Sequence, residues 1–63
     1  MWTVVFIAPN KEEAERIRSV LSREGILVKL KAIGQSHQGV NCSVEILVPE
    51  AEADEALEII NTL

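Results

Sequence analysis

The sequence predicts a small α+β domain, a two-layer sandwich whose elements follow the order β-α-β-β-α. Its 63 residues leave room for a single domain spanning residues 1–63. Two segments carry apolar residues at helical spacings of three and four, and three shorter segments show the alternation typical of strands. Proline, glycine and asparagine residues separate these segments and mark their ends.

The first predicted strand covers residues 2–8, and its residues form two alternating sets that are both largely apolar, Trp2, Val4, Phe6 and Ala8 against Thr3, Val5 and Ile7. Two apolar sets predict complete or partial burial of the strand on both faces. Pro9 ends this strand. Asn10 is the predicted N-cap of the next element, with Glu13 three residues later as in a capping box.

The first predicted helix covers residues 11–24. Its apolar positions fall on one stripe, Ala14, Ile17, Val20 and Leu21. Glu12 and Arg16, four residues apart, form a favourable pair on the exposed side. Gly25 is expected just after the helix, where the backbone needs a positive φ.

The second predicted strand covers residues 26–33 and is half exposed. It turns Val28, Leu30 and Ala32 to one face and Leu27, Lys29 and Lys31 to the other. The third covers residues 42–48, with Val44, Ile46 and Val48 pointing inward. Pro49 ends it, and a second helix over residues 50–62 follows, with the apolar stripe Ala53, Ala56, Leu57, Ile60 and Leu63.

This element order predicts a truncated ferredoxin-like fold. A right-handed crossover places the first two strands parallel, and the third returns antiparallel between them, which gives the strand order 1-3-2 with both helices on one face. The first strand, which is the most apolar, is then an edge strand, and one face of the sheet has no helix over it. Because both surfaces are hazards in a monomer, we expect a homodimer that pairs them.

Charge and cysteine content exclude several classes of function. The net charge is −4, and all six basic residues lie between Lys11 and Lys31. Nucleic-acid binding needs lysine and arginine to displace counterions from phosphates, so no nucleic-acid partner is expected. A single cysteine, Cys42, favours a reducing compartment, most simply the cytoplasm. The apolar start has neither the length of a membrane span nor the flanks of a signal peptide.

Two sets of residues are candidates for a binding site. Residues 34–41 form a polar segment whose glycines and amides could bind an anion through backbone N–H groups, with charge added from the second strand. This predicted ligand site comprises Lys29, Lys31, Gly34, Ser36, His37, Gly39 and Asn41. The alternative is a plain connection beside a solvated strand face. The predicted interface residues are Trp2, Val5, Ile7 and Leu47.

Catalysis, metals and cofactors are not expected. His37 and Cys42 are the only residues of their types, and a closed zinc site needs four ligands. No phosphate-binding or dinucleotide fingerprint is present. A chain this short has little room for the concave, water-excluding pocket that an enzyme needs.

Several stretches resemble a family of small bacterial proteins of unknown function described as prokaryotic signal transducing proteins. They are residues 1–5 (MWTVV), 7–10 (IAPN), the helix end Glu24-Gly25, and 43–50 (SVEILVPE). The likeness spans nearly the whole chain. It implies a fold related to PII-type regulators, which are ferredoxin-like and bind small effectors or partner proteins, and it implies no particular site residues.

Two functions remain open at this point. The first is a cytoplasmic, dimeric regulatory module that binds a small anionic effector or a partner protein through residues 34–42 and the neighbouring lysines. The second is a structural adaptor that binds another protein through the open sheet face or the edge of the first strand.

Overall fold

The computed structural model describes residues 1–33 and 43–63, and its elements follow the predicted order. They are β1 (Trp2–Ala8), α1 (Lys11–Arg23), β2 (Lys29–Ile33), β3 (Ser43–Pro49), a short 3₁₀ turn η1 (Glu50–Glu52) and α2 (Ala53–Asn61).

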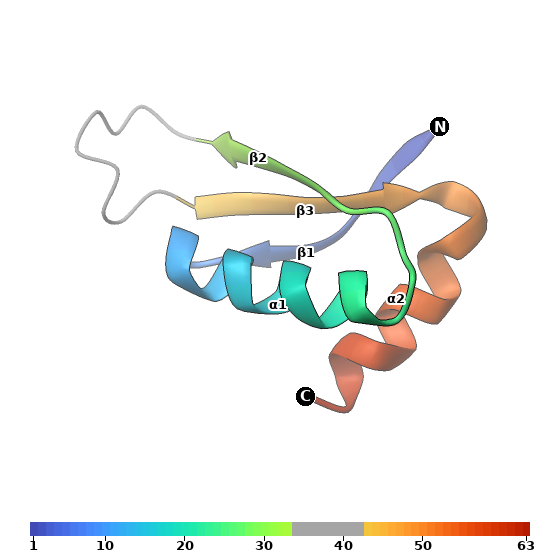
Figure 1. The fold of residues 1–63 in the computed structure, drawn as a ribbon. Helices are drawn as coiled ribbons and strands as arrows, with labels where there is room; N and C mark the ends of the chain where they lie inside the picture. Colours follow the sequence, from blue (N-terminus) through green and yellow to red (C-terminus); the bar gives the residue numbers. More distant parts are fainter. Residues whose placement is uncertain (34–42) are drawn as a thin grey trace.

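The three strands form one sheet in the order β1-β3-β2. Both β1 and β2 pair antiparallel with β3, so they run parallel to each other, as the crossover through α1 requires. Both helices lie on the same side of the sheet (Figure 1). The predicted truncated ferredoxin-like α+β fold is therefore confirmed.

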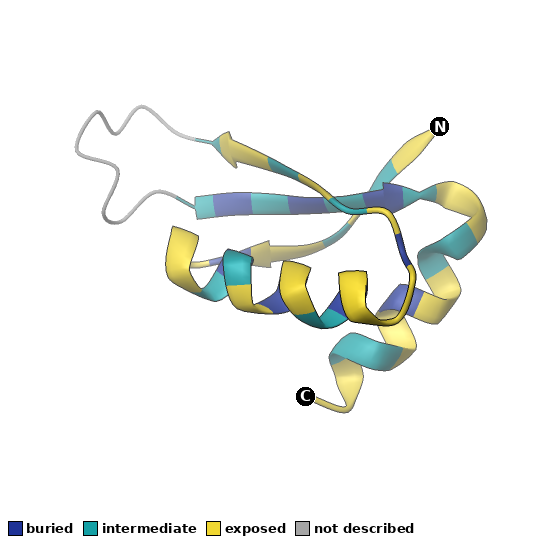
Figure 2. Cartoon of the chain, in the orientation of Figure 1, coloured by how far each residue is buried: buried dark blue, intermediate teal, exposed yellow. Residues whose placement is uncertain are grey.

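The core lies between the sheet and the two helices. Strand β3 alternates strictly: Val44, Ile46 and Val48 are buried, whereas the residues between them are only half-buried (Figure 2). This is the pattern of a central strand with one covered face. Among residues 1–33 and 43–63, the buried residues are Ala8, Ala14, Ile17, Leu21, Ile26, Val44, Ile46, Val48 and Ala56.

Helix α1 begins with the predicted cap. The side-chain oxygen of Asn10 accepts a hydrogen bond from the backbone N–H of Glu13 at 2.8 Å, which satisfies one of the unpaired donors of the first turn. The reciprocal half of a capping box does not form. The carboxylate of Glu13 instead accepts two hydrogen bonds from Arg16, so the predicted pairing of Arg16 with Glu12 was wrong by one residue.

A Schellman motif ends α1 and turns the chain into the sheet. Gly25 has φ of 87°, as predicted, and its N–H bonds to the carbonyl of Ser22. The N–H of Ile26 reaches back to the carbonyl of Leu21, and both of these side chains are buried. Because this motif uses Ile26 to close the helix, β2 starts at Lys29 and not at residue 26.

Strand β1 contains an irregularity that strict alternation did not predict. Val4 pairs with Leu47, but Phe6 pairs with Ile46, so β1 advances two residues while β3 advances one. Because of this β-bulge, even-numbered residues before it and even-numbered residues after it point to opposite faces of the sheet. Trp2 therefore lies on the uncovered face although Ala8, in the same alternating set, is fully buried.

The second helix is shorter than predicted and packs differently. Residues Glu50–Glu52 form the 3₁₀ turn, and only Ala53–Asn61 are α-helical. Ala56 is buried, and Ala53, Ile59 and Ile60 pack against the core. Leu57 and Leu63, expected on the buried stripe, are exposed.

Candidate functional site

The uncovered side of the sheet is the candidate site, and we call it the outer face. The strand register assigns its members, because residues paired across antiparallel strands share a face. They are Trp2, Val4 and Ile7 from β1, Ser43, Glu45, Leu47 and Pro49 from β3, and Lys29, Lys31 and Ile33 from β2.

Two cross-strand rows organise this surface. In one row Leu47 lies between Val4 and Lys29, and in the next Glu45 lies between Ile7 and Lys31. Each row therefore runs from an apolar residue on β1 to a lysine on β2. Glu45 and Lys31 are directly opposite each other in the register, a favourable arrangement for opposite charges.

Trp2 and Lys29 link the two edges of the sheet. The Lys29 ammonium lies over the indole ring, 5.4 Å from its centroid, although the two residues sit on strands separated by β3. This is the geometry of a cation–π interaction. The contact joins the apolar side of this face, on β1, to its basic side, on β2.

The apolar side of the outer face remains open to solvent. Trp2 and Val4 each keep 42% of their surface exposed, and Ile7 keeps 53%. A few well-buried side chains supply most of the binding energy at protein interfaces, and tryptophan is among the residue types enriched there. The arrangement can therefore bind a surface that is partly apolar, while Lys29 and Lys31 attract negative charge along one border.

The structure places part of the predicted ligand site. Lys29 and Lys31 are exposed on the outer face, two residues apart on β2. The other predicted members lie outside the described residues, namely Gly34, Ser36, His37, Gly39 and Asn41. Lys29 also engages Trp2, a connection that the sequence did not indicate.

The predicted interface residues divide between the two sides of the sheet. Trp2, Ile7 and Leu47 lie on the outer face by their register. Val5 packs against the core cluster and is half-buried. Val4, which was not predicted, takes its place on the outer face. The bulge explains the exchange, since parity alone groups Val5 with Ile7, and no residue type in this apolar run marks an inserted position.

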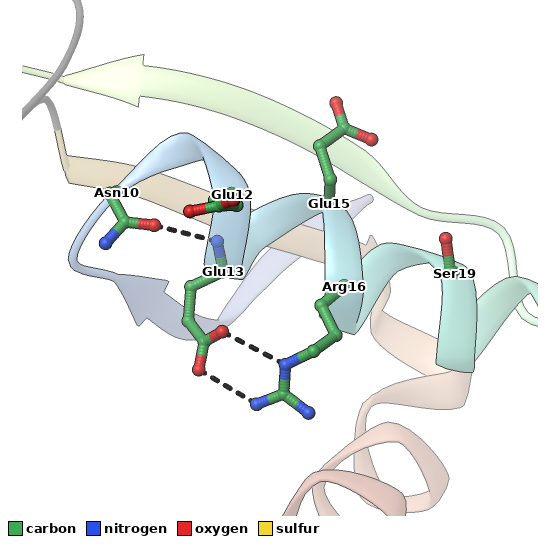
Figure 3. Close-up of a pocket in the computed structure, with 6 residues that line it drawn as sticks. All are labelled: Asn10, Glu12, Glu13, Glu15, Arg16 and Ser19. Atoms are coloured by element: carbon green, nitrogen blue, oxygen red, sulfur yellow. Dashed lines mark hydrogen bonds and ion pairs between the residues drawn. The ribbon is translucent and has the colours of Figure 1, made fainter.

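A second, shallow hollow lies along the start of α1 (Figure 3). Its lining comes from one helix and its cap, namely Asn10, Glu12, Glu13, Glu15, Arg16 and Ser19. Three of its charged side chains are already in ion pairs, Glu13 with Arg16 inside the hollow and Glu15 with Arg18 outside it. The hollow is open to solvent and offers no group that converges on a bound molecule.

Glu13 and Arg16, which both line this hollow, change each other's pKa. The hydrogen bonds from Arg16 lower the pKa of the Glu13 carboxyl below its ordinary value, and the charge of Arg16 acts in the same direction. The same contact raises the pKa of the Arg16 guanidinium. Both groups are therefore held in their charged forms, which favours a structural ion pair over proton transfer.

Within residues 1–33 and 43–63, no group of three histidine, cysteine, aspartate or glutamate side chains is arranged to hold a metal ion. In the same ranges, neither helix has the length and apolar character needed to span a bilayer.

Comparisons of this chain with protein-family models, with curated proteins and with solved structures give no match. The family resemblance of the sequence accordingly stays a prediction.

Proposed function

We propose that this protein is a non-enzymatic regulatory module that binds a partner protein through the outer face of its sheet. The observation that carries the proposal is the exposure of Trp2, Val4 and Ile7 side by side on a face without a helix. Apolar side chains grouped in this way on a small domain are typical of an interaction surface.

Charge supports a partner of particular chemistry. Lys29 and Lys31 border the apolar side chains, and both are exposed. Their position favours a partner surface that is apolar at its centre and acidic along one border, because complementary charge steers association and fixes orientation. Glu45 adds a single negative charge in the row of Lys31 and so further restricts how a partner can be oriented on this face.

A small anionic effector is the second candidate. It is favoured by the two exposed lysines, which lie two residues apart on one face of β2. Lysine is a common ligand of phosphate and carboxylate groups. In this version, residues 34–42 would complete the site from the end of β2.

The setting of this activity forms part of the proposal. The sequence resemblance and the single cysteine support a signal-transducing role in the cytoplasm of a bacterial cell. An exposed apolar edge strand supports a homodimer as the working form.

Capture experiments with face-specific variants test the proposal. Wild-type protein, a Lys29→Glu/Lys31→Glu variant and a Val4→Asp variant would be immobilised and exposed to a bacterial lysate under native conditions. Arg16→Glu/Arg18→Glu is the matched control, since it reverses two charges on α1, away from the outer face. Bound proteins and small molecules would be identified by mass spectrometry.

The expected result is an acidic protein that is retained by the wild type and by the control but lost from both face variants. A phosphorylated or carboxylated metabolite lost only from the double-lysine variant would support the second candidate. Retention of every bound species by both face variants would refute a role for the outer face.

A further inference from the structure

The free edge of β1 has a defined pattern of open hydrogen-bonding groups. The carbonyl of Met1 accepts a hydrogen bond from the N–H of Glu50 at 2.8 Å, so the backbone groups of Met1 point towards β3. In an antiparallel ladder, successive residues point their N–H and C=O groups to opposite sides. The N–H and C=O groups of Thr3 therefore also point towards β3. Those of Trp2 and Val4 lie in the plane of the sheet and point away from β3, at its free edge.

Pro49 fits this alternation. It pairs with Trp2 at a position where the two strands exchange no hydrogen bonds, so its missing N–H costs the ladder nothing. The alternation holds up to the bulge between Val4 and Phe6. The regular part of the free edge is thus residues 2–4, with two N–H and two C=O groups open.

The two edges of the sheet differ in how they are protected. Strand β2 carries exposed Lys29 and Lys31, and charged side chains, lysine above all, discourage strand addition at an edge. If β2 paired with β2 of another molecule, these lysines would approach each other. Strand β1 contains no charged residue, so two copies of β1 can align without opposing like charges.

We propose that a second copy of this chain pairs with the β1 edge, antiparallel and about a two-fold axis at Thr3. Trp2 of each copy would then exchange both backbone hydrogen bonds with Val4 of the other. The bulge confines the pairing to residues 2–4, since beyond Val4 the backbone N–H and C=O groups no longer alternate regularly along the free edge. An isologous contact of this kind closes on itself and does not propagate into a fibre.

The pairing also extends the outer face. Trp2 and Val4 project their side chains onto that face in each copy. Joining two β1 edges therefore places four apolar side chains next to one another, with the lysines of the two β2 strands at the outer borders. This inference deepens the proposed function, on which it rests: the dimer would present one wide apolar surface flanked by basic residues on both sides.

A proline substitution tests the backbone contact directly. Val4→Pro removes an N–H that the monomer does not use, and proline is tolerated in an edge strand where its missing N–H faces solvent. Val4→Ala is the matched control, because it removes the side chain and keeps the N–H. Sedimentation equilibrium would measure the dimer dissociation constant, and far-ultraviolet circular dichroism would check the fold.

The wild type is expected to be a dimer at tens of micromolar, and Val4→Ala should raise its dissociation constant only modestly. Val4→Pro should raise the dissociation constant by about a hundredfold, because it removes two hydrogen bonds per dimer. If Val4→Pro does not fold, amide hydrogen exchange of the wild type decides the matter. The Trp2 and Val4 amides should then be protected in concentrated samples and exchange rapidly on dilution.

Three outcomes would overturn the edge pairing. A Val4→Pro variant that dimerises like the wild type excludes it, and so do Trp2 and Val4 amides that exchange rapidly in a proven dimer. A wild-type monomer excludes both the pairing and the dimer. None of these results tests partner capture by the outer face, which is tested by the Lys29→Glu/Lys31→Glu variant. The edge pairing and the partner-binding proposal can therefore be refuted independently.

Discussion

The ammonium of Lys29 lies 5.4 Å from the centroid of the Trp2 ring, so side chains from the two edge strands meet over the central strand. In the register, Lys29 is opposite Leu47, and Trp2 is opposite the residue two positions further along β3. The contact therefore runs diagonally across β3, a span that the long lysine side chain and the indole ring bridge together. It joins the apolar and the basic halves of the outer face.

Replacing Lys29 with alanine should break this contact at a small cost in stability. An exposed cation–π pair contributes about 0.5–1 kcal/mol. Urea unfolding followed by circular dichroism would measure the change, and Lys31→Ala is the control. In wild-type NMR spectra the Lys29 side-chain protons should be shifted upfield by the indole ring. A Trp2→Leu variant that leaves those shifts unchanged would contradict the contact.

Two neighbouring residues on β3 should respond very differently to truncation. Ile46 is fully buried under the helices, whereas Leu47 lies on the outer face and is half-buried. Ile46→Ala should cost about 2–5 kcal/mol through lost burial and the cavity left behind. Leu47→Ala should cost clearly less in urea unfolding. Equal costs for the two variants would mean that the outer face is covered in the monomer.

The cap of α1 gives a third prediction. Asn10→Ala removes the acceptor for the Glu13 N–H and should destabilise the protein by about 0.5–2 kcal/mol. Asn10→Asp keeps an acceptor at the same place and should retain most of the stability. Thermal unfolding of both variants measures the difference. Similar melting temperatures for alanine and aspartate at position 10 would argue against the cap.

Replacing Gly25 in the turn after α1 should lower the stability of the protein because of its backbone conformation. Gly25 has φ of 87° and open space where a Cβ would lie. Gly25→Ala should therefore cost about 1 kcal/mol through backbone strain and not through a clash. Gly25→Asn should cost less, because asparagine tolerates this backbone region better. Chemical denaturation would rank the three proteins, and an alanine variant as stable as wild type would refute the explanation.

The ion pair on α1 predicts a pH dependence. Arg16 lowers the pKa of Glu13 in the folded protein below its ordinary value of 4.5. The stabilising contribution is therefore complete above the unfolded pKa and is lost as the pH falls through the lower, folded pKa. The melting-temperature difference between wild type and Glu13→Gln should shrink on acidification through this range. Glu12→Gln controls for the loss of one negative charge in the same turn.

Local chemistry explains which parts of the fold could be predicted from the sequence. The Asn10 cap, the positive φ of Gly25 and the alternation of Val44, Ile46 and Val48 each depend on residues close in the chain. The strand order followed from the handedness of the crossover. These features need no knowledge of distant contacts, and all of them are present.

The missed features depend on contacts between distant segments. The bulge in β1 is set by its pairing with β3, about forty residues away in the chain, where Leu47 and Ile46 face Val4 and Phe6. The first part of the predicted second helix became a 3₁₀ turn, where the N–H of Glu50 is bound by Met1. A single sequence contains no signal for either pairing.

The candidate site was predictable only in part for the same reason. Alternation placed Lys29 and Lys31 on an exposed face of β2 correctly. The contact of Lys29 with Trp2 could not be predicted, and neither could the position of Val4, rather than Val5, on the outer face. Both depend on the pairing of the strands. The remaining predicted ligands, from Gly34 to Asn41, fall outside the described residues and stay a prediction.

The core described above consists entirely of aliphatic residues, and this has an optical consequence. The chain has one tryptophan, one phenylalanine and no tyrosine. Trp2 and Phe6 both lie on β1 with 42% and 36% of their surface exposed. The tryptophan fluorescence of this protein therefore reports directly on the outer face of the sheet. Emission from Trp2 should respond to a partner docked on this face without any added label.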